Sequence, residues 1–273
     1  MPLLNIKKNK RKSDRPFFII MGAIASIYVL FLVVLILADL SYTTPSEILN
    51  ALKDEQIQYS IKLSLISCTI TMFLSLIVAI PLGFLMARYE FRFKKLIDAI
   101  LDIPIILPPL VIGISLLILF NQTPLKDFLD QFGISVSFTI VGVILAQFTV
   151  ACAFAIKTMY VTFAQINNRQ EQVALTLGCN QKQSFFYVLL PQAKNGILTA
   201  GALAWSRALG EFGPLLVFSG STRMHTEVLS ISVYLEMTTG KIEAAVGISL
   251  IMIASGFVVL MLVRLLGTNK YVF

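Results

Sequence analysis

The sequence has few charged residues: Asp, Glu, Lys and Arg make up only 14% of its 273 residues, whereas 57% are hydrophobic. The mean hydropathy of +0.83 lies far above that of an ordinary soluble domain. The apolar residues fall in long blocks, and the sequence between the blocks is too short for a separate soluble domain. The composition therefore predicts a single bundle of helices with membrane lipid as its solvent.

Cysteine and histidine are scarce. The three cysteines, Cys68, Cys152 and Cys179, are widely spaced and form no disulfide or metal-binding pattern. The single histidine, His225, has no second ligand nearby and is expected to be a polar loop residue. The sequence also lacks a Gly-x-x-x-x-Gly-Lys-Ser/Thr loop for ATP and a Gly-x-Ser-x-Gly motif near the histidine. We predict no catalytic residue, metal site or cofactor on this chain, which argues against the alternative of a membrane enzyme.

Basic residues give the chain a net charge of +7, but their positions do not suggest nucleic-acid binding. Six of the 22 lie in residues 1–16, immediately before an apolar run, as a topogenic signal does. If the apolar spans alternate in direction, sixteen basic residues fall on the side of the N-terminus and five on the other. The positive-inside rule then places both termini in the cytoplasm of a multi-pass cell-membrane protein.

Six stretches are long enough to cross a hydrocarbon core, which takes roughly 20 helical residues. They are 17–38, 63–87, 103–121, 134–156, 195–220 and 244–263. The predicted fold is thus an all-α membrane protein with six transmembrane helices. It has a basic tail at 1–16, one transmembrane domain at 17–266 and a short cytoplasmic tail at 267–273. The first stretch exceeds a signal-peptide core in length, so we expect a retained anchor.

Three prolines, Pro104, Pro108 and Pro109, mark the start of the third span. Proline frees backbone groups inside a membrane helix, which favours a kink or a late helix start. Proline is equally tolerated in the first turn of a helix, so an ordinary N-terminus remains the alternative.

The longest cytoplasmic loop follows the fourth span and takes 38 residues, from Lys157 to Lys194. Asn168 is expected to cap a first short helix, with Glu171 three residues later as in a capping box. Gly178 is expected to end this helix. A second short helix would then run to Pro191. This pattern predicts a compact helix–turn–helix, at about 164–191, for contact with a soluble partner.

The loop resembles the coupling loop of ABC importer permeases, which has a Glu-Ala-Ala head, a glycine, and a Leu-Pro tail thirteen residues after the glycine. The matching residues here are Glu171, Gln172, Val173, Ala174, Gly178, Val188, Leu190 and Pro191. The head departs from the family pattern, because Gln172 stands in place of Glu and Val173 in place of the first Ala. The resemblance implies a type I importer fold, with the loop docked on a cytoplasmic ABC ATPase that binds ATP and Mg²⁺. An amphipathic loop lying on the membrane is the alternative.

The fifth predicted span carries two charges, Arg207 and Glu211, four residues apart and therefore on one helix face. They are expected to neutralise each other, either as a structural pair or beside a translocation path. Small residues recur every four positions along the same span and allow close helix packing. They are Gly196, Ala200, Ala204 and Ala208.

The segment Arg207–Gly213, which includes Gly210, Glu211 and Gly213, is similar to the matching segment of oxyanion importers. Residues 107–113 and 220–227 extend this similarity. It implies a permease subunit for molybdate or tungstate, with sulfate or thiosulfate as the alternative, fed by an extracytoplasmic oxyanion-binding protein. A path between two copies would make a symmetric homodimer. A secondary transporter is the alternative from another class, although inverted repeats are not evident.

Overall fold

The computed structural model describes residues 15–266, and every regular element in that range is a helix. The long ones are α1 (Arg15–Tyr42), α3 (Glu55–Arg88), α7 (Ile140–Gln165), α11 (Lys194–Leu209) and α13 (Ile242–Leu266). The all-helical membrane fold predicted from the sequence is confirmed. The tail at 267–273 lies outside the described residues, as do residues 1–14 of the basic tail, so both tail assignments stay predictions.

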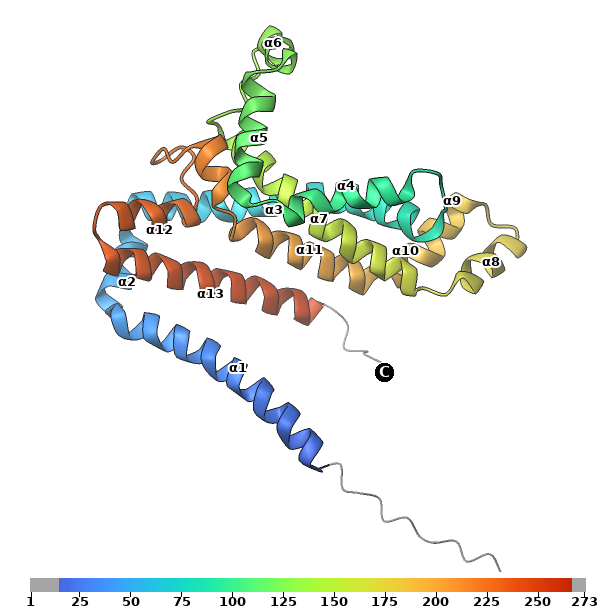
Figure 1. The fold of residues 1–273 in the computed structure, drawn as a ribbon, viewed down its shortest axis with the longest axis horizontal. Helices are drawn as coiled ribbons and strands as arrows, with labels where there is room; N and C mark the ends of the chain where they lie inside the picture. The colour runs from blue at the N-terminus through green and yellow to red at the C-terminus, as the bar shows by residue number, and fades with distance from the viewer. Residues whose placement is uncertain (1–14, 267–273) are drawn as a thin grey trace, which may run out of the picture.

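The centre of the molecule is a bundle in which α3, α7 and α11 run side by side (Figure 1). Glycines let the backbones approach closely: a Cβ atom on Gly83 of α3 would lie 2.7 Å from the Cβ of Met159 on α7. Gly196 of α11 likewise rests against Thr162 of α7. The alanines that follow Gly196 at four-residue spacing are buried in the same core. The predicted stripe of small residues therefore serves helix packing.

Helix α1 leaves the bundle at an angle and lies against α13 only along part of its length (Figure 1). The apolar side chains of α1 are exposed around the whole circumference of the helix. Such a surface belongs in lipid or against another membrane helix.

The shorter elements occupy the ends of the bundle (Figure 1). Near α2 (Pro45–Lys53) at one end lies α12 (Leu229–Thr238), whereas the loop after α7 occupies the opposite end. That loop consists of α8 (Asn168–Thr176), α9 (Gln181–Ser184), the π-helix η1 (Phe185–Leu189) and α10 (Leu190–Gln192).

The third predicted span, 103–121, is not one helix. Helix α4 (Lys94–Ile106) ends before Leu107, and α5 (Pro109–Asn121) starts again at an angle of 110° to it. Pro108 and Pro109 cannot donate backbone hydrogen bonds and disfavour a helical conformation in the residue before them. Both alternatives hold in part, because the chain bends here and Pro109 also lies in the first turn of a new helix, and the size of the bend corrects the single-span assignment. Helix α5 leads away from the bundle to α6 (Pro124–Gln131) (Figure 1).

The fifth predicted span, 195–220, is also interrupted. Helix α11 has 16 residues and ends at Leu209, and a π-helix, η2, follows at Leu215–Ser219. By length and composition, four described helices could cross a membrane unbroken, namely α1, α3, α7 and α13, and the α4–α5 pair could make a fifth. The prediction of six continuous spans is therefore wrong for two of them, 103–121 and 195–220, because the structure interrupts both.

The two interrupted segments cross each other through glycine and proline. A Cβ atom on Gly113 of α5 would lie 2.9 Å from the Cα of Pro214, just before η2. A Cβ atom on Gly213 would lie 2.9 Å from the Cβ of Pro109, at the start of α5. Each glycine thus rests on the proline of the other segment, and the two backbones approach each other closely at this crossing.

Candidate functional site

The first helix of the loop after α7 has a different cap from the one predicted. Asn167, in an extended conformation, is the N-cap of α8, and its Oδ1 accepts a hydrogen bond from the backbone N–H of Arg169 at 2.9 Å. Asn168 is the first helical residue, so its side chain is free for another partner. The reciprocal capping box occurs instead in α9, between Asn180 and Gln183. The prediction of Asn168 as the cap is wrong by one position, because two adjacent asparagines offer the same chemistry.

Gly178 ends this helix as predicted. Its φ is +92°, in the left-handed region that favours glycine. Its N–H donates to the carbonyl of Leu175 at 3.0 Å, while the N–H of Cys179 donates to the carbonyl of Ala174 at 3.1 Å. These two bonds are those of a Schellman motif, which closes the end of the helix and fixes the direction of the following chain.

The loop presents apolar side chains to solvent at the end of the bundle. Leu177 is 80% exposed and Tyr187 76%. Of the predicted coupling residues, Gln172, Val173, Gly178 and Pro191 are exposed, Glu171, Val188 and Leu190 are half-buried, and Ala174 is buried. Phe185 anchors the loop from beneath, because its ring lies 4.8 Å from that of Phe84 on α3. The predicted residues therefore lie together in one exposed loop, 164–191, which Phe185 anchors to α3 and which we call the knob.

The predicted charged pair of the fifth span forms, but Glu211 lies two residues beyond the end of α11 and not on a shared helix face. Arg207 Nη1 lies 2.8 Å from Glu211 Oε2, and the Glu211 side chain is only 1% exposed. The guanidinium also lies over the ring of Phe154, with 5.7 Å between its Cζ and the ring centroid. Of the other two residues assigned to this site, Gly210 is exposed and Gly213 packs against Pro109.

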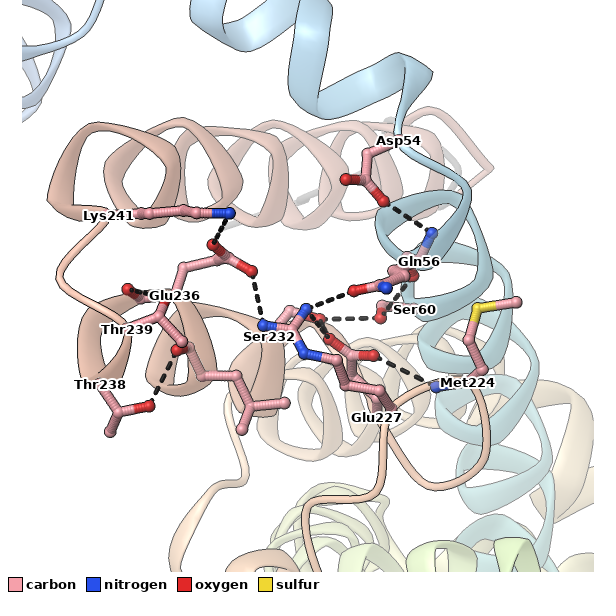
Figure 2. A network of polar contacts seen from close by, with 12 residues as sticks. Asp54, Gln56, Ser60, Met224, Glu227, Ser232, Glu236, Thr238, Thr239 and Lys241 are labelled. Atoms are coloured by element: carbon pink, nitrogen blue, oxygen red, sulfur yellow. Dashed lines mark hydrogen bonds and ion pairs between the residues drawn. The ribbon is translucent and has the colours of Figure 1, made fainter.

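Arg223 organises a polar network at the N-terminal end of α3, opposite the coupling loop, and this network was not predicted from the sequence. Its partners Gln56, Glu227 and Glu236 are shown in Figure 2. Arg223 Nη2 donates to Glu236 Oε1 at 2.8 Å, and Nη1 donates to Gln56 Oε1 in the first turn of α3. Nη1 also lies 3.7 Å from Oε1 of the buried Glu227. The hydrogen bond to Glu236 raises the pKa of the Arg223 guanidinium, so its charge is fixed.

Hydroxyl and backbone groups complete this network (Figure 2). The Ser232 hydroxyl lies 2.9 Å from Glu227 Oε1 and 2.7 Å from Ser60 Oγ on α3. The Met224 N–H donates to Glu227 Oε2 at 3.3 Å. The loop at 220–228 is therefore tied both to α3 and to α12. We call the group formed by Gln56, Ser60, Arg223, Glu227, Ser232, Glu236 and Lys241 the outer network.

A line of buried hydroxyls continues along α3 from the outer network. Its members are at most 1% exposed and follow one another at spacings of three or four residues. They are Ser60, Ser64, Ser67, Thr71 and Ser75. Ser64 Oγ accepts the N–H of Leu229 at 2.8 Å, and Thr71 Oγ1 lies 3.3 Å from Gln147 Oε1 on α7. The spacing was visible in the sequence and could have identified this face.

Comparison with known proteins agrees with this architecture. Residues 79–269 match the family described as binding-protein-dependent transport system inner membrane component. The chain belongs to this family and is therefore a multi-pass permease component of an ABC importer.

Two of its relatives are named for sulfate and for molybdenum, and a third is named for no substrate. The chain is 31% identical over 245 residues to the probable transport system permease protein NifC of Clostridium pasteurianum, covering 89% of this chain and 85% of that one. It is 27% identical over 234 residues to the sulfate transport system permease protein CysT of Escherichia coli, with 85% and 83% covered. It is 31% identical over 197 residues to the molybdenum transport system permease protein ModB of Mycobacterium tuberculosis, with 72% and 74% covered.

Solved structures share the fold. A chain of a bacterial alginate ABC transporter, solved in complex with an alginate pentasaccharide-bound periplasmic protein, superposes with a TM-score of 0.74 at 14% sequence identity. The match covers 94% of this chain and 96% of that one. The type I importer fold implied by the coupling-loop resemblance is thereby confirmed.

Proposed function

We propose that this chain forms the translocation path of an importer for molybdate or tungstate. In this proposal a separate cytoplasmic ATPase binds ATP and Mg²⁺ and docks on the loop at 164–191, and an extracytoplasmic binding protein delivers the anion. Sulfate is the second candidate, because the relative named for sulfate covers 85% of the chain at 27% identity, whereas the one named for molybdenum covers 72% at 31% identity.

The exposed knob after α7 is the observation that carries the ATPase part of the proposal. Its helix α8 is closed by the Schellman motif at Gly178, and its apolar residues Val173 and Leu177 face solvent. Solvated apolar side chains on a rigid support are typical of a docking site for a protein partner. The orientation that puts this knob in the cytoplasm remains a prediction from the basic residues.

The pairing of the arginines supports passage of an anion without tight binding. Arg207 is compensated by Glu211, and Arg223 is compensated by Glu227 and Glu236. An unpaired arginine at membrane depth would hold a dianion strongly, whereas an unpaired glutamate would repel it. Compensated pairs leave a path that binds the anion weakly, and selection then falls to the outer binding protein.

Two copies of the chain are expected to enclose the path. The broken helix pair α4–α5 exposes many apolar side chains on a single chain, among them Ile100, Ile106 and Leu110. Pairing of identical surfaces about a two-fold axis buries such segments symmetrically.

Uptake into proteoliposomes tests the substrate. The chain, its ATPase and its binding protein would be reconstituted and supplied with labelled molybdate, tungstate or sulfate, with and without ATP. We expect ATP-dependent uptake of molybdate and tungstate. Uptake of a sugar, an amino acid or a cation with no oxyanion flux would contradict the proposal.

The variant Glu211→Gln tests the charged pair in the same assay. It should lower uptake about tenfold with little loss of assembled complex, since it leaves Arg207 uncompensated beside the path. Glu90→Gln is the matched control, because Glu90 makes a comparable pair with Lys94 but is 87% exposed. Uptake at the wild-type rate by Glu211→Gln would remove the pair from the transport mechanism.

A further inference from the structure

Arg88 lies in the last turn of α3 and reaches across to the coupling loop. Its Nη2 donates to the backbone carbonyl of Ile166 at 2.9 Å, and its Nη1 donates to the side-chain oxygen of Asn168. Its Nε lies 3.6 Å from Glu171 Oε2. One guanidinium thus contacts both the residue that closes α7 and the first turn of α8.

The surroundings of Arg88 indicate a structural joint and not a surface charge. The Arg88 side chain is only 7% exposed, although it ends a membrane helix at the side assigned to the cytoplasm. A basic residue that serves lipid headgroups or topology points outward and remains hydrated. The planar fork of Arg88 holds two acceptors in fixed directions, which the single ammonium group of lysine cannot do, and its Nε adds an ionic contact with Glu171.

The same helix is held at its other end by the outer network. Gln56 and Ser60, in the first two turns of α3, contact Arg223 and Ser232. Helix α3 has 34 residues and so spans about 50 Å at 1.5 Å per residue. One continuous helix therefore joins the coupling loop to the loop at 220–228.

We propose that Arg88 is a positioning residue that makes α8 and α3 move together, so that α3 delivers the displacement of the coupling loop to the outer loop at 220–228. The inference rests on the proposed function, because a docked ATPase must supply the displacement. Without the joint, α8 would be connected to the membrane helices mainly through its covalent links and the packing of Phe185, and it would move without carrying α3.

The test compares three variants in the reconstituted complex. Arg88→Gln removes the charge and most of the fork, and Arg88→Lys keeps the charge. Arg92→Gln is the matched control, because Arg92 is a neighbouring basic residue that is exposed. Three quantities are measured for each: the amount of ATPase that co-purifies, the rate of ATP hydrolysis, and the amount of oxyanion taken up per ATP hydrolysed.

Arg88→Gln should retain the ATPase and its hydrolysis but lower uptake per ATP about tenfold, with Arg88→Lys intermediate and Arg92→Gln unchanged. Glu171→Gln changes a partner of Arg88 on α8 and should lower uptake per ATP by a smaller factor. It replaces the Arg88 variants in the test if those fold poorly. Wild-type uptake per ATP in both Arg88→Gln and Glu171→Gln would overturn this inference alone. A parallel fall in ATPase binding, hydrolysis and uptake would also overturn it, since it would indicate a docking role.

A second readout follows the outer loop directly. Thr222, exposed in that loop, is changed to cysteine and labelled with a membrane-impermeant maleimide in the presence and absence of ATP. ATP should change the labelling rate in the otherwise wild-type complex and leave it constant when Arg88→Gln is added. An ATP response that survives Arg88→Gln would overturn the inference. A wild-type complex that neither binds an ATPase nor takes up oxyanion would instead overturn the proposed function, and this inference with it.

Discussion

The two ends of α3 are both held by an arginine, but charge and burial are arranged in opposite ways. At the coupling loop the cation is buried, with Arg88 7% exposed, while Glu171 and Asn168 can be reached by water. In the outer network the carboxylates are buried, with Glu227 1% and Glu236 9% exposed, and Arg223 is 33% exposed. Removing Arg88 therefore leaves partners that water can hydrate, whereas removing Arg223 leaves buried charges unpaired. We therefore expect the outer network to contribute more to stability than the contacts of Arg88 do.

Removing Arg223 should have the largest effect on stability. Arg223→Met should lower the free energy of unfolding by about 1–3 kcal/mol, since Glu227 and Glu236 lose their charged partner in a buried setting. Arg88→Met should cost less, because its partners remain hydrated. Thermal unfolding of both variants in the same detergent measures the difference. An equal or larger fall in Tm for Arg88→Met would contradict the contrast between the two ends.

Gly178 and Gly240, at opposite ends of the bundle, allow a similar backbone strain to be introduced at either end. Gly178 and Gly240 both have positive φ, +92° and +78°, and a Cβ atom at either would meet nothing within 4 Å. Valine at either position should cost about 1–2 kcal/mol of backbone strain. Only Gly178→Val should lower uptake per ATP, because only Gly178 closes the coupling helix. Equal loss of coupling in Gly240→Val would mean that the strain acts through general destabilisation.

Lys241 should matter least. Its Nζ lies 3.9 Å from Glu236 Oε2 and its side chain is 71% exposed, so water screens the pair. Lys241→Gln should change the free energy of unfolding by less than about 0.5 kcal/mol. A fall in Tm matching that of Arg223→Met would show that the outer network depends on its peripheral cation and not on its central one.

The parts of the fold that the sequence predicted are those that depend on local chemistry. Long apolar runs located the helices, and Gly178 ended α8 as expected because the Schellman motif uses only neighbouring residues. Pro108 and Pro109 signalled a bend, but its angle of 110° depends on what α5 packs against. The end of α11 at Leu209 was missed, although Gly210, Gly213 and Pro214, which follow it, are residues that commonly end helices.

The parts that could not be predicted join residues far apart in the chain. Arg223 and Gln56 are 167 positions apart, and Arg88 and Asn168 are 80 apart, so no local pattern connects them. The resemblance to oxyanion importers did identify residues 220–227, but gave no hint that Arg223 is engaged within its own chain. Placement of each arginine needed the packing of α3 in three dimensions.

The crossing of the two interrupted segments limits how they can move. Helices separated by a layer of side chains can slide, because rotamers rearrange as they pass. At Gly113 and Gly213 the two backbones approach each other closely, and the nearest atoms belong to prolines whose rings do not rotate away. Sliding α5 along η2 would drive one backbone into the other, whereas rotation about the contact keeps both glycines seated. We therefore expect any opening between these segments to be a rotation about this contact and not a sliding of one segment along the other.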